Sequence, residues 1–300
     1  MKVALYGKQI ERLWYPRLKT LVETLTGYPV ELLCCGELQA VFQELGLLSL
    51  TRPVETPDHL PVDTDLFLSL GGDGTFLAAM TWVQDRNIPV AGINFGHLGF
   101  LTTVQLAQSA DDARWVKELL HGNYRIDERF LLQVNASVAI GSLYPYALNE
   151  ISLQRHRPQM MGVHLTIDEA ELPPFQADGL LISTSTGSTA YSLSVGGPIL
   201  LPGTGGIILS PIAPHNLNVR PLIVPYTSRI RVRLSLRAGT SEVALTADNR
   251  SVPFPEGAVL EVTRAPFSLR RVSLSGDEFI SALQEKLFWG MDRRYAVNEQ

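Results

Sequence analysis

The chain has 300 residues, of which 45% are apolar and 18% are charged, and its formal net charge is −5. At roughly 150 residues per domain this length predicts two domains, and the composition excludes a wholly disordered chain. The acidic balance argues against a nucleic-acid partner held by phosphate neutralisation. The longest unbroken apolar run, Phe76 to Met80, is far shorter than the roughly 20 residues of a membrane span. We therefore predict a cytoplasmic protein with no signal peptide and no membrane partner.

The first third of the chain alternates between two periodicities. Short apolar stretches, predicted as strands, occupy residues 2–6, 30–35, 65–70 and 89–93, and stretches of helical spacing occupy 9–25, 37–48, 74–85 and 106–121. This alternation predicts βαβ units and a mostly parallel sheet. The adjacent Cys34 and Cys35 fit neither a disulfide framework nor a paired zinc motif, and we predict that they lie on a buried strand.

From about Tyr124 onward, period-two strands dominate the sequence. Strands are predicted at residues 129–139, 145–153, 161–168, 228–236, 242–247 and 257–263, and a last helix at 276–289. The predicted fold is an α/β N-terminal domain with a mostly parallel sheet, a β-rich C-terminal domain, and a C-terminal helix that returns to the N-terminal domain. The predicted boundaries are 1–125 for the α/β domain, 126–275 for the β-rich domain and 276–300 for the helix and tail.

A glycine-rich turn follows the third predicted strand and consists of Gly71, Gly72, Asp73, Gly74 and Thr75. Glycines let the backbone approach a ligand closely, and the N-terminus of the predicted helix that follows favours a phosphate. An aspartate would repel an anion, so Asp73 is better explained as a base for a hydroxyl or as a contact to a bound cation. The alternative is an ordinary tight turn in which Asp73 is the helix N-cap.

Two further segments carry candidate binding residues. Residues 92–102 contain Gly96 and Gly99, which would let this loop lie close to a neighbouring segment or to a ligand. Asn149 and Glu150 offer donors and acceptors that suit a ribose or a purine edge. Adjacent residues of a strand point to opposite faces, so this pair contacts one ligand only if the strand bends or ends there.

The densest cluster of polar side chains spans residues 178–199 and is rich in serine and threonine. Hydroxyls and backbone N–H groups bind a polar ligand without adding net charge, and Tyr191 can stack on a base or a ribose. The alternative is a solvated turn, which is common for such a composition. Apolar residues on one side and glycines on the other favour a tightly folded region and hence a binding site.

Together these segments resemble the NAD kinase family over most of the chain. The matching pieces are LGGDGT at 70–75, NFGHLGFL at 94–101, NE at 149–150, DGLLISTSTGSTAYSLSVGGPI at 178–199 and PIAPHNLNVRP at 211–221. The resemblance implies phosphoryl transfer from ATP to the 2′-hydroxyl of the adenosine ribose of NAD, giving NADP. It also implies a divalent metal ion, most simply Mg²⁺ bound mainly through ATP rather than by protein ligands, and a homodimer or homotetramer.

The resemblance also implies roles for individual residues. Asp73 matches the catalytic aspartate. The nucleotide phosphates are implied to bind at Gly71, Gly72, Asp73, Gly74 and Thr75. The dinucleotide is implied to bind at Asn149, Glu150, Asp178, Thr189, Ala190, Tyr191, Ser192, Leu193 and Ser194.

Four residues depart from the family pattern. Ser185 stands where the family usually has proline, and Asn249-Arg250 stands where it usually has Gly-Gln. Gln176 occupies a position at which some members carry arginine or lysine. Arg250 is therefore a candidate for supplying the charge that Gln176 does not.

Two other functions remain open at the level of sequence. A lipid kinase or other small-molecule kinase would share only the glycine turn, and it would leave Asn149, Glu150 and the hydroxyl cluster at 183–194 without a purpose. A sensor that binds NAD or NADP without catalysis would be favoured by loss of the aspartate, whereas Asp73 is present.

Overall fold

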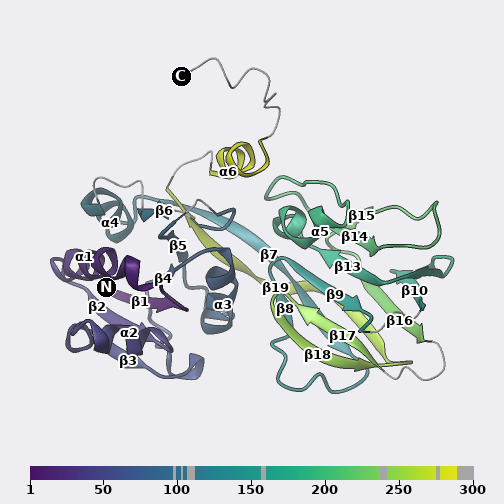
Figure 1. Ribbon diagram of the computed structural model, residues 1–300, viewed down its shortest axis with the longest axis horizontal. Coiled ribbons are helices and arrows are strands. Elements are labelled where there is room, and N and C mark those ends of the chain that lie inside the picture. The colour runs from purple at the N-terminus through teal and green to yellow at the C-terminus, as the bar shows by residue number, and fades with distance from the viewer. Residues whose placement is uncertain are drawn as a thin grey trace, which may run out of the picture. The chain divides into compact units, whose positions relative to one another are not determined.

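The computed structural model describes residues 1–96, 99–102, 104–106, 112–156, 160–236, 242–274 and 278–288 (Figure 1). The chain divides into two compact units. The first consists of residues 1–127 together with 270–300, and the second consists of residues 128–269. The long strands β7 and β19 contain the points at which the chain passes between the units, so each unit is built partly from the two strands that they share.

The first unit contains a parallel sheet. Its strand order is β3 (Arg52–Val54), β2 (Glu31–Cys35), β1 (Lys2–Gly7), β4 (Leu66–Leu70), β5 (Val90–Asn94) and the last part of β19 (Val259–Ser273), with β6 (Val104–Gln105) beside β5. β4 is buried along its whole length and β1 from Val3 to Gly7, as expected for a parallel sheet covered on both faces. Cys34 and Cys35 lie on β2 and are buried, which confirms their predicted location.

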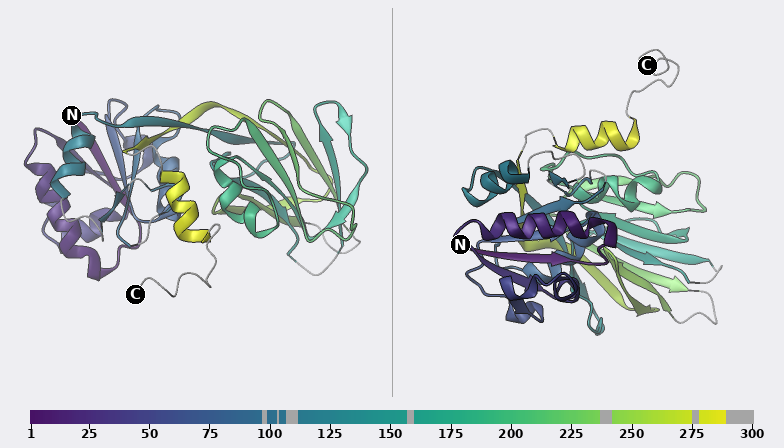
Figure 2. Two further views of the ribbon diagram at one scale, coloured as in Figure 1. Left: turned by 90° about the horizontal axis from the view of Figure 1, so that it is seen from above. Right: turned by 60° about the vertical axis from the view of Figure 1, so that its left-hand side comes forward.

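Helices cover both faces of this sheet. One face shares a core with α1 (Tyr15–Thr26), α2 (Leu38–Glu44) and α4 (Asp112–Leu120), and the right-hand view of Figure 2 shows α1 lying along the sheet. Tyr6 on the opposite face contacts Trp82 of α3 (Asp73–Val83), with ring centres 5.6 Å apart. Short 3₁₀ helices also lie in the connections: η1 (Arg12–Trp14), η2 (Leu48–Leu50) and η3 (Pro57–His59).

The last helix of the chain, α6 (Glu278–Leu287), also belongs to the first unit. Phe279 near its start contacts Phe100 in the loop after β5, with ring centres 5.8 Å apart. None of the helices among the described residues is both long enough and apolar enough to span a membrane.

The second unit consists of two sheets whose inner faces share one apolar core, a packing typical of β-sandwiches. One sheet contains β7 (Arg125–Ala136), β8 (Tyr146–Ala147), β10 (Met161–Ile167), β11 (Ala170–Glu171), β12 (Phe175–Ala177), β16 (Ile230–Leu236) and the first part of β19. The other runs in the order β15 (Leu222–Pro225), β14 (Gly206–Ile212), β13 (Gly179–Ser183), β9 (Glu150–Gln154), β17 (Glu242–Ala247) and β18 (Arg250–Pro255). Two short helices, η5 (Thr186–Thr189) and α5 (Tyr191–Ser194), follow β13.

The predicted fold class is confirmed, and individual elements differ from the prediction. The strand predicted at 145–153 is interrupted at Leu148 and Asn149, because the amides there bond to a side chain instead of a strand partner. The strand predicted at 257–263 continues to Ser273. Part of the helix predicted at 106–121 falls at residues 107–111, outside the described residues, and α4 begins at Asp112.

Candidate active site

The glycine-rich turn joins β4 to α3 in the first unit, so the predicted strand–turn–helix arrangement is confirmed. Gly71 has a φ of +149°, a value that other residues rarely adopt, and a Cβ there would overlap the side chain of Thr75. Its N–H donates to the carbonyl of Ile93 at 2.8 Å, which fixes the turn to β5. Gly72 is the N-cap of α3, so the helix presents its first amides and the positive end of its dipole at this turn.

The carboxylate of Asp73 is held by the loop after β5. Its Oδ2 accepts the N–H of Phe100 at 3.0 Å, and its Oδ1 accepts the N–H of Leu101 at 3.1 Å. Gly99 makes this approach possible, because a Cβ at that position would overlap Oδ1 of Asp73. The alternative interpretation of Asp73 as the helix N-cap is therefore wrong, since Gly72 takes that position and both carboxylate oxygens bond to a distant loop.

The side chain of Asp73 is still 30% exposed, so it remains accessible to a ligand. Its third neighbour is the ammonium group of Lys286 on α6, with Nζ 3.7 Å from Oδ2. His97 and Leu98, which belong to the same glycine-containing segment, lie outside the described residues.

A cavity of about 460 Å³ opens beside the glycine turn within the first unit. Lys8 gives it one cation, and the rings of Trp14 and Phe95 stack at its wall with centres 5.8 Å apart and planes inclined by 27°. The lining residues come from the loop after β1, the glycine turn and the end of β5: Lys8, Gln9, Ile10, Glu11, Leu13, Trp14, Leu70, Gly71, Gly72, Thr75, Asn94, Phe95 and Gly96. A cavity that combines a cation, aromatic rings and helix-terminal amides suits a nucleotide.

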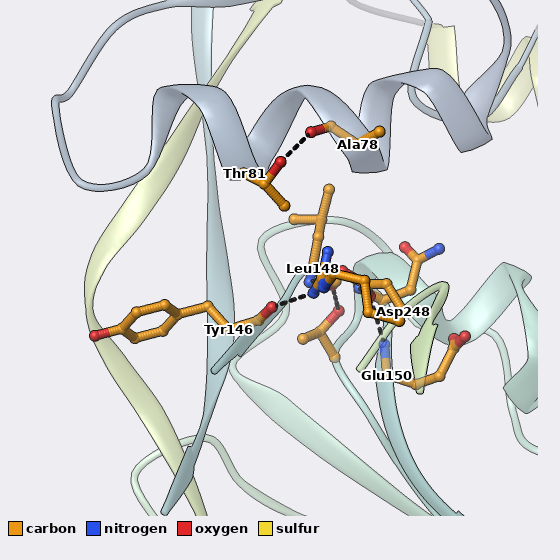
Figure 3. Close-up of polar contacts among 9 residues, drawn as sticks. Ala78, Thr81, Tyr146, Leu148, Glu150 and Asp248 are labelled. Atoms are coloured by element: carbon orange, nitrogen blue, oxygen red, sulfur yellow. Dashed lines mark hydrogen bonds and ion pairs between the residues drawn. The ribbon is translucent and has the colours of Figure 1, made fainter. Parts of the chain in front are cut away.

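In the second unit, the buried carboxylate of Asp248 holds the start of β9. Its Oδ2 accepts the N–H of Leu148 at 3.0 Å, and its Oδ1 accepts the N–H groups of Asn149 at 2.8 Å and Glu150 at 3.2 Å (Figure 3). The N–H of Asp248 in turn donates to the carbonyl of Glu150 at 2.9 Å. The chain therefore bends where Asn149 and Glu150 lie, which is the condition for both side chains to reach one ligand.

Arg250 supports the same bend. Its Nη2 donates to the carbonyl of Tyr146 at 2.6 Å and lies 3.5 Å from Oδ2 of Asp248, and its guanidinium lies 5.5 Å from the ring centre of Tyr144. Burial raises the pKa of the Asp248 carboxyl, and Arg250 and the three amides oppose this effect. Gln176 has different neighbours, since its N–H donates to the side chain of Asn216.

The hydroxyl cluster that follows β13 packs directly on Asn149. The carbonyl of Asn149 accepts the N–H of Thr184 at 2.9 Å and the hydroxyl of Ser183 at 3.1 Å. Gly187 lies so close that a Cβ there would overlap the backbone of Asn149, and the hydroxyl of Thr184 accepts its N–H at 3.0 Å. Two segments that are 34 residues apart in the sequence thus pack together and form one side of the site.

Glu150 is the acidic residue on this side of the site. The backbone N–H of Tyr191 donates to its carboxylate, and burial, followed by the charge of Asp248, raises its pKa to about 8. Within the described part of the chain, its Oε2 is buried and has no hydrogen-bond partner. Buried polar atoms are normally paired, so this oxygen is suited to a ligand hydroxyl or amine.

Two family models of known proteins match this chain, one mainly in each unit. The chain matches the family model of the ATP-NAD kinase N-terminal domain over residues 38–124 and that of the C-terminal domain over residues 148–274. An NAD kinase of Bacteroides fragilis is 36% identical over 295 residues, which cover 98% of this chain and 100% of that protein. The chain belongs to the NAD kinase family. The predicted family and the predicted enzyme class, a phosphotransferase that acts on NAD with ATP, are confirmed.

Other members of the NAD kinase family give the same result. The NAD kinase of Christiangramia forsetii is 34% identical over 298 residues, covering 98% of this chain and 100% of that protein. Two solved structures share the fold at 24% identity. Yeast NADH kinase complexed with NADH has a TM-score of 0.85 and matches 98% of this chain and 89% of that chain. An NAD kinase from Archaeoglobus fulgidus in complex with ATP has a TM-score of 0.70 and matches 95% and 98%.

The structure brings most of the predicted dinucleotide residues together. Asn149, Glu150 and the short helix α5 meet through the bond from Tyr191 to Glu150. The residues of this segment differ in exposure: Ser192 is fully buried, Tyr191 is 37% exposed, and Thr189, Ala190, Leu193 and Ser194 are at least partly exposed.

Asp178 is separated from this group within the chain. It precedes β13, whereas Glu150 pairs with Ser183 at the other end of that strand. Five residues of extended chain span about 17 Å. Asp178 contacts Arg155 at 2.7 Å and His215 at 3.8 Å instead, so its dinucleotide contact stays a prediction.

Sequence reasoning missed three residues of these sites. It assigned no role to Asp248, because its partners lie 98 to 100 residues earlier in the chain. It gave Gly99 a general role in close approach without naming Asp73 as the neighbour. It assigned no role to Lys286, because a lysine in the last turn of a predicted helix is common and reveals nothing about its neighbour.

Proposed function

We propose that the chain transfers the terminal phosphoryl group of ATP to the 2′-hydroxyl of the adenosine ribose of NAD, giving NADP. The observation that carries this proposal is an accessible carboxylate, Asp73, fixed by two amides in a turn that is otherwise built to bind phosphate. In this proposal the domain at 1–125 holds the phosphates and the domain at 126–275 holds most of the dinucleotide.

Asp73 is proposed to accept the proton of the 2′-hydroxyl. As the hydroxyl oxygen bonds to the terminal phosphorus of ATP, the bond from that phosphorus to the oxygen of the leaving ADP breaks, and the proton passes to the carboxylate. General-base assistance contributes on the order of 10²- to 10⁴-fold. Most of the remaining acceleration in phosphoryl transfer comes from alignment and from neutralisation of the transferred group.

The donor is proposed to lie in the cavity beside the glycine turn. The amides at Gly72, Asp73 and Gly74 and the side chain of Thr75 are proposed to hold its phosphates, while Gly71 shapes the turn. Lys8 adds a cation at the cavity wall, and Trp14 offers an aromatic face for the base. The ATP complex of the structurally similar archaeal NAD kinase supports a nucleotide triphosphate as the donor.

The acceptor is proposed to bind at the bend held by Asp248. Asn149 and Glu150 would bond to the ribose or the base, with the unpartnered Oε2 of Glu150 as the main contact. Residues Thr189 to Ser194 would supply backbone and hydroxyl contacts, and Tyr191 an exposed ring. The yeast NADH kinase structure with NADH supports a dinucleotide ligand in this fold.

A divalent metal ion is part of the proposal. Mg²⁺ usually keeps several waters and is held by one or two carboxylates together with substrate phosphates. Among the described residues, no group of three or more His, Cys, Asp or Glu side chains could hold a metal ion, while Asp73 offers hard oxygen ligands beside the phosphate turn. These residues fit an ion bound mainly through ATP, where it would neutralise charge on the triphosphate.

A homodimer or homotetramer is also proposed. The second unit exposes large apolar side chains at one edge of its sheet: Leu217 is 86% exposed, Leu222 43% and Ile223 46%. Leu222 and Ile223 lie on β15, the edge strand, and Leu217 lies in the segment that precedes it; apolar groups exposed at an edge strand favour association. The cytoplasmic location stays a prediction from the sequence.

The direct test is incubation with NAD, ATP and Mg²⁺ followed by measurement of NADP. The Asp73→Asn variant should lose about 10²- to 10⁴-fold in kcat while its affinity for NAD changes little, because the substitution removes the base and keeps the shape of the side chain. Asp85→Asn, at an exposed position just after α3, is the matched control and should keep full activity.

Two outcomes would contradict the proposal. Near-full activity of Asp73→Asn would remove the proposed role of Asp73. Binding of NAD by the unmodified protein without any NADP formation would favour the sensor over the kinase.

A further inference from the structure

The C-terminal helix α6 turns one face toward the first unit. Ala282 is fully buried, Leu283 is 9% exposed, and Phe279 contacts Phe100. Residues at positions i, i+3, i+4 and i+7 share one face of a helix. Lys286 therefore shares the side of the helix that carries these three residues, although Lys286 itself is exposed.

The side chain of Lys286 reaches Asp73 of the glycine turn. Its Nζ lies 3.7 Å from Oδ2 of Asp73 and 5.0 Å from the centre of the Phe100 ring, and its side chain is 35% exposed. Phe100 links the two partners, because its N–H donates to the same Oδ2 atom while its ring lies beneath the ammonium group. Asp73 is thus held by two amides and one charge.

The ordinary explanation of such a lysine is a favourable contact with the C-terminal dipole of its helix or a surface ion pair, and both effects are small. Neither effect depends on which carboxylate the lysine faces, and here it faces Asp73. The negative charge of Asp73, by contrast, gives a physical reason for a cation at this place. A carboxylate beside a phosphate-binding turn repels the phosphates that the turn attracts, at distances where unit charges interact strongly.

We propose that Lys286 is a positioning residue of the reaction: it offsets the charge of Asp73, so that the carboxylate can stay in a turn that also receives the phosphates of the donor. This proposal rests on the proposed role of Asp73. It makes α6 a part of the catalytic unit, because the helix carries the balancing charge from the opposite end of the sequence.

The test uses the full chain and three variants. Lys286→Met keeps the length of the side chain and removes its charge, Lys286→Arg keeps the charge, and Glu285→Gln changes an exposed charge on the same helix. The first should weaken binding of a non-hydrolysable ATP analogue with Mg²⁺ by about five- to tenfold and lower kcat, while KM for NAD is unchanged. Lys286→Arg should keep most of the affinity for the analogue and most of kcat. Glu285→Gln should match the unmodified protein in both quantities.

The decisive measurement repeats Lys286→Met in the Asp73→Asn background. Because the lysine offsets the charge of Asp73, removing both charges should return the affinity for the analogue to about that of the unmodified protein. A double variant that binds as weakly as Lys286→Met would overturn the proposal, as would a Lys286→Met variant that binds and turns over normally. Calorimetric binding needs no turnover, so failure of NADP formation would count against the proposed function alone.

Discussion

The two carboxylates Asp73 and Asp248 make the same kind of contact in different settings. Each accepts backbone N–H groups from a distant loop: two from residues 100 and 101 for Asp73, and three from residues 148 to 150 for Asp248. Each also lies near one cation. The difference is exposure, since the side chain of Asp73 is 30% exposed and that of Asp248 is fully buried.

This difference separates a reacting group from a scaffold. An exposed carboxylate with fixed geometry can exchange a proton with a substrate, whereas a buried one with every oxygen engaged can only hold the backbone in shape. The hydrogen bonds alone would not distinguish the two roles. Substitutions at the two sites should therefore differ in what they damage, catalysis at one and folding at the other.

The largest expected effect is on stability. Asp248→Ala leaves three buried N–H groups and part of the Arg250 charge without their acceptor, and we expect it to lower the free energy of unfolding by about 3–5 kcal/mol. Asp73→Ala, at the more exposed site, should cost only about 1 kcal/mol. Urea unfolding of both variants measures the contrast, and equal losses would contradict the assignment of scaffold and reacting group.

The second-largest expected effect is a change of folding stability with pH. Because the pKa of Glu150 is raised to about 8 in the folded chain, its protonated form is favoured by folding. Stability is therefore complete below the unfolded pKa near 4.5 and is lost as the pH rises through 8. Glu150→Gln avoids this loss, so its stability relative to the unmodified chain should improve by roughly 2–4 kcal/mol between pH 5 and pH 9.

Thermal unfolding at both pH values provides the measurement for Glu150. Asp127→Asn, in the first unit, serves as a control that should show no such trend. A constant difference between the Gln variant and the unmodified protein across this range would show that Glu150 is not the buried acid described here.

The smallest effect comes from two glycines, one at each site. Gly187→Ala forces a Cβ against the backbone of Asn149, which cannot give way easily, so we expect a loss of about 1–3 kcal/mol in stability. Gly99→Ala meets the carboxylate of Asp73, which can rotate. We therefore expect a smaller loss of stability and a drop in kcat of at least about tenfold, because the base is displaced. Parallel unfolding and kinetic measurements on the two variants check the contrast, and a reversed pattern would contradict it.

The sequence predicted those parts of the sites that consist of consecutive residues. The glycine turn, the Asn149-Glu150 pair and the hydroxyl cluster are visible because their spacing carries the chemistry, and the same motifs indicated the family. The alternation of periods predicted an α/β unit and a β-rich unit, because side-chain periodicity reports local structure. The break at Leu148 and Asn149 was missed, since its cause is a side chain about 100 residues away.

The sequence by itself thus determined the residues that can bind phosphate and ribose, together with the order of strands and helices around them. Only the tertiary structure decided which carboxylate is exposed and which is buried, that Gly99 lets a loop reach Asp73, and that Lys286 meets Asp73 from the last helix. The physical reason is that burial, charge pairing and close backbone approach depend on contacts between segments far apart in the chain. A local pattern contains no information about which distant residue will fill the space beside it.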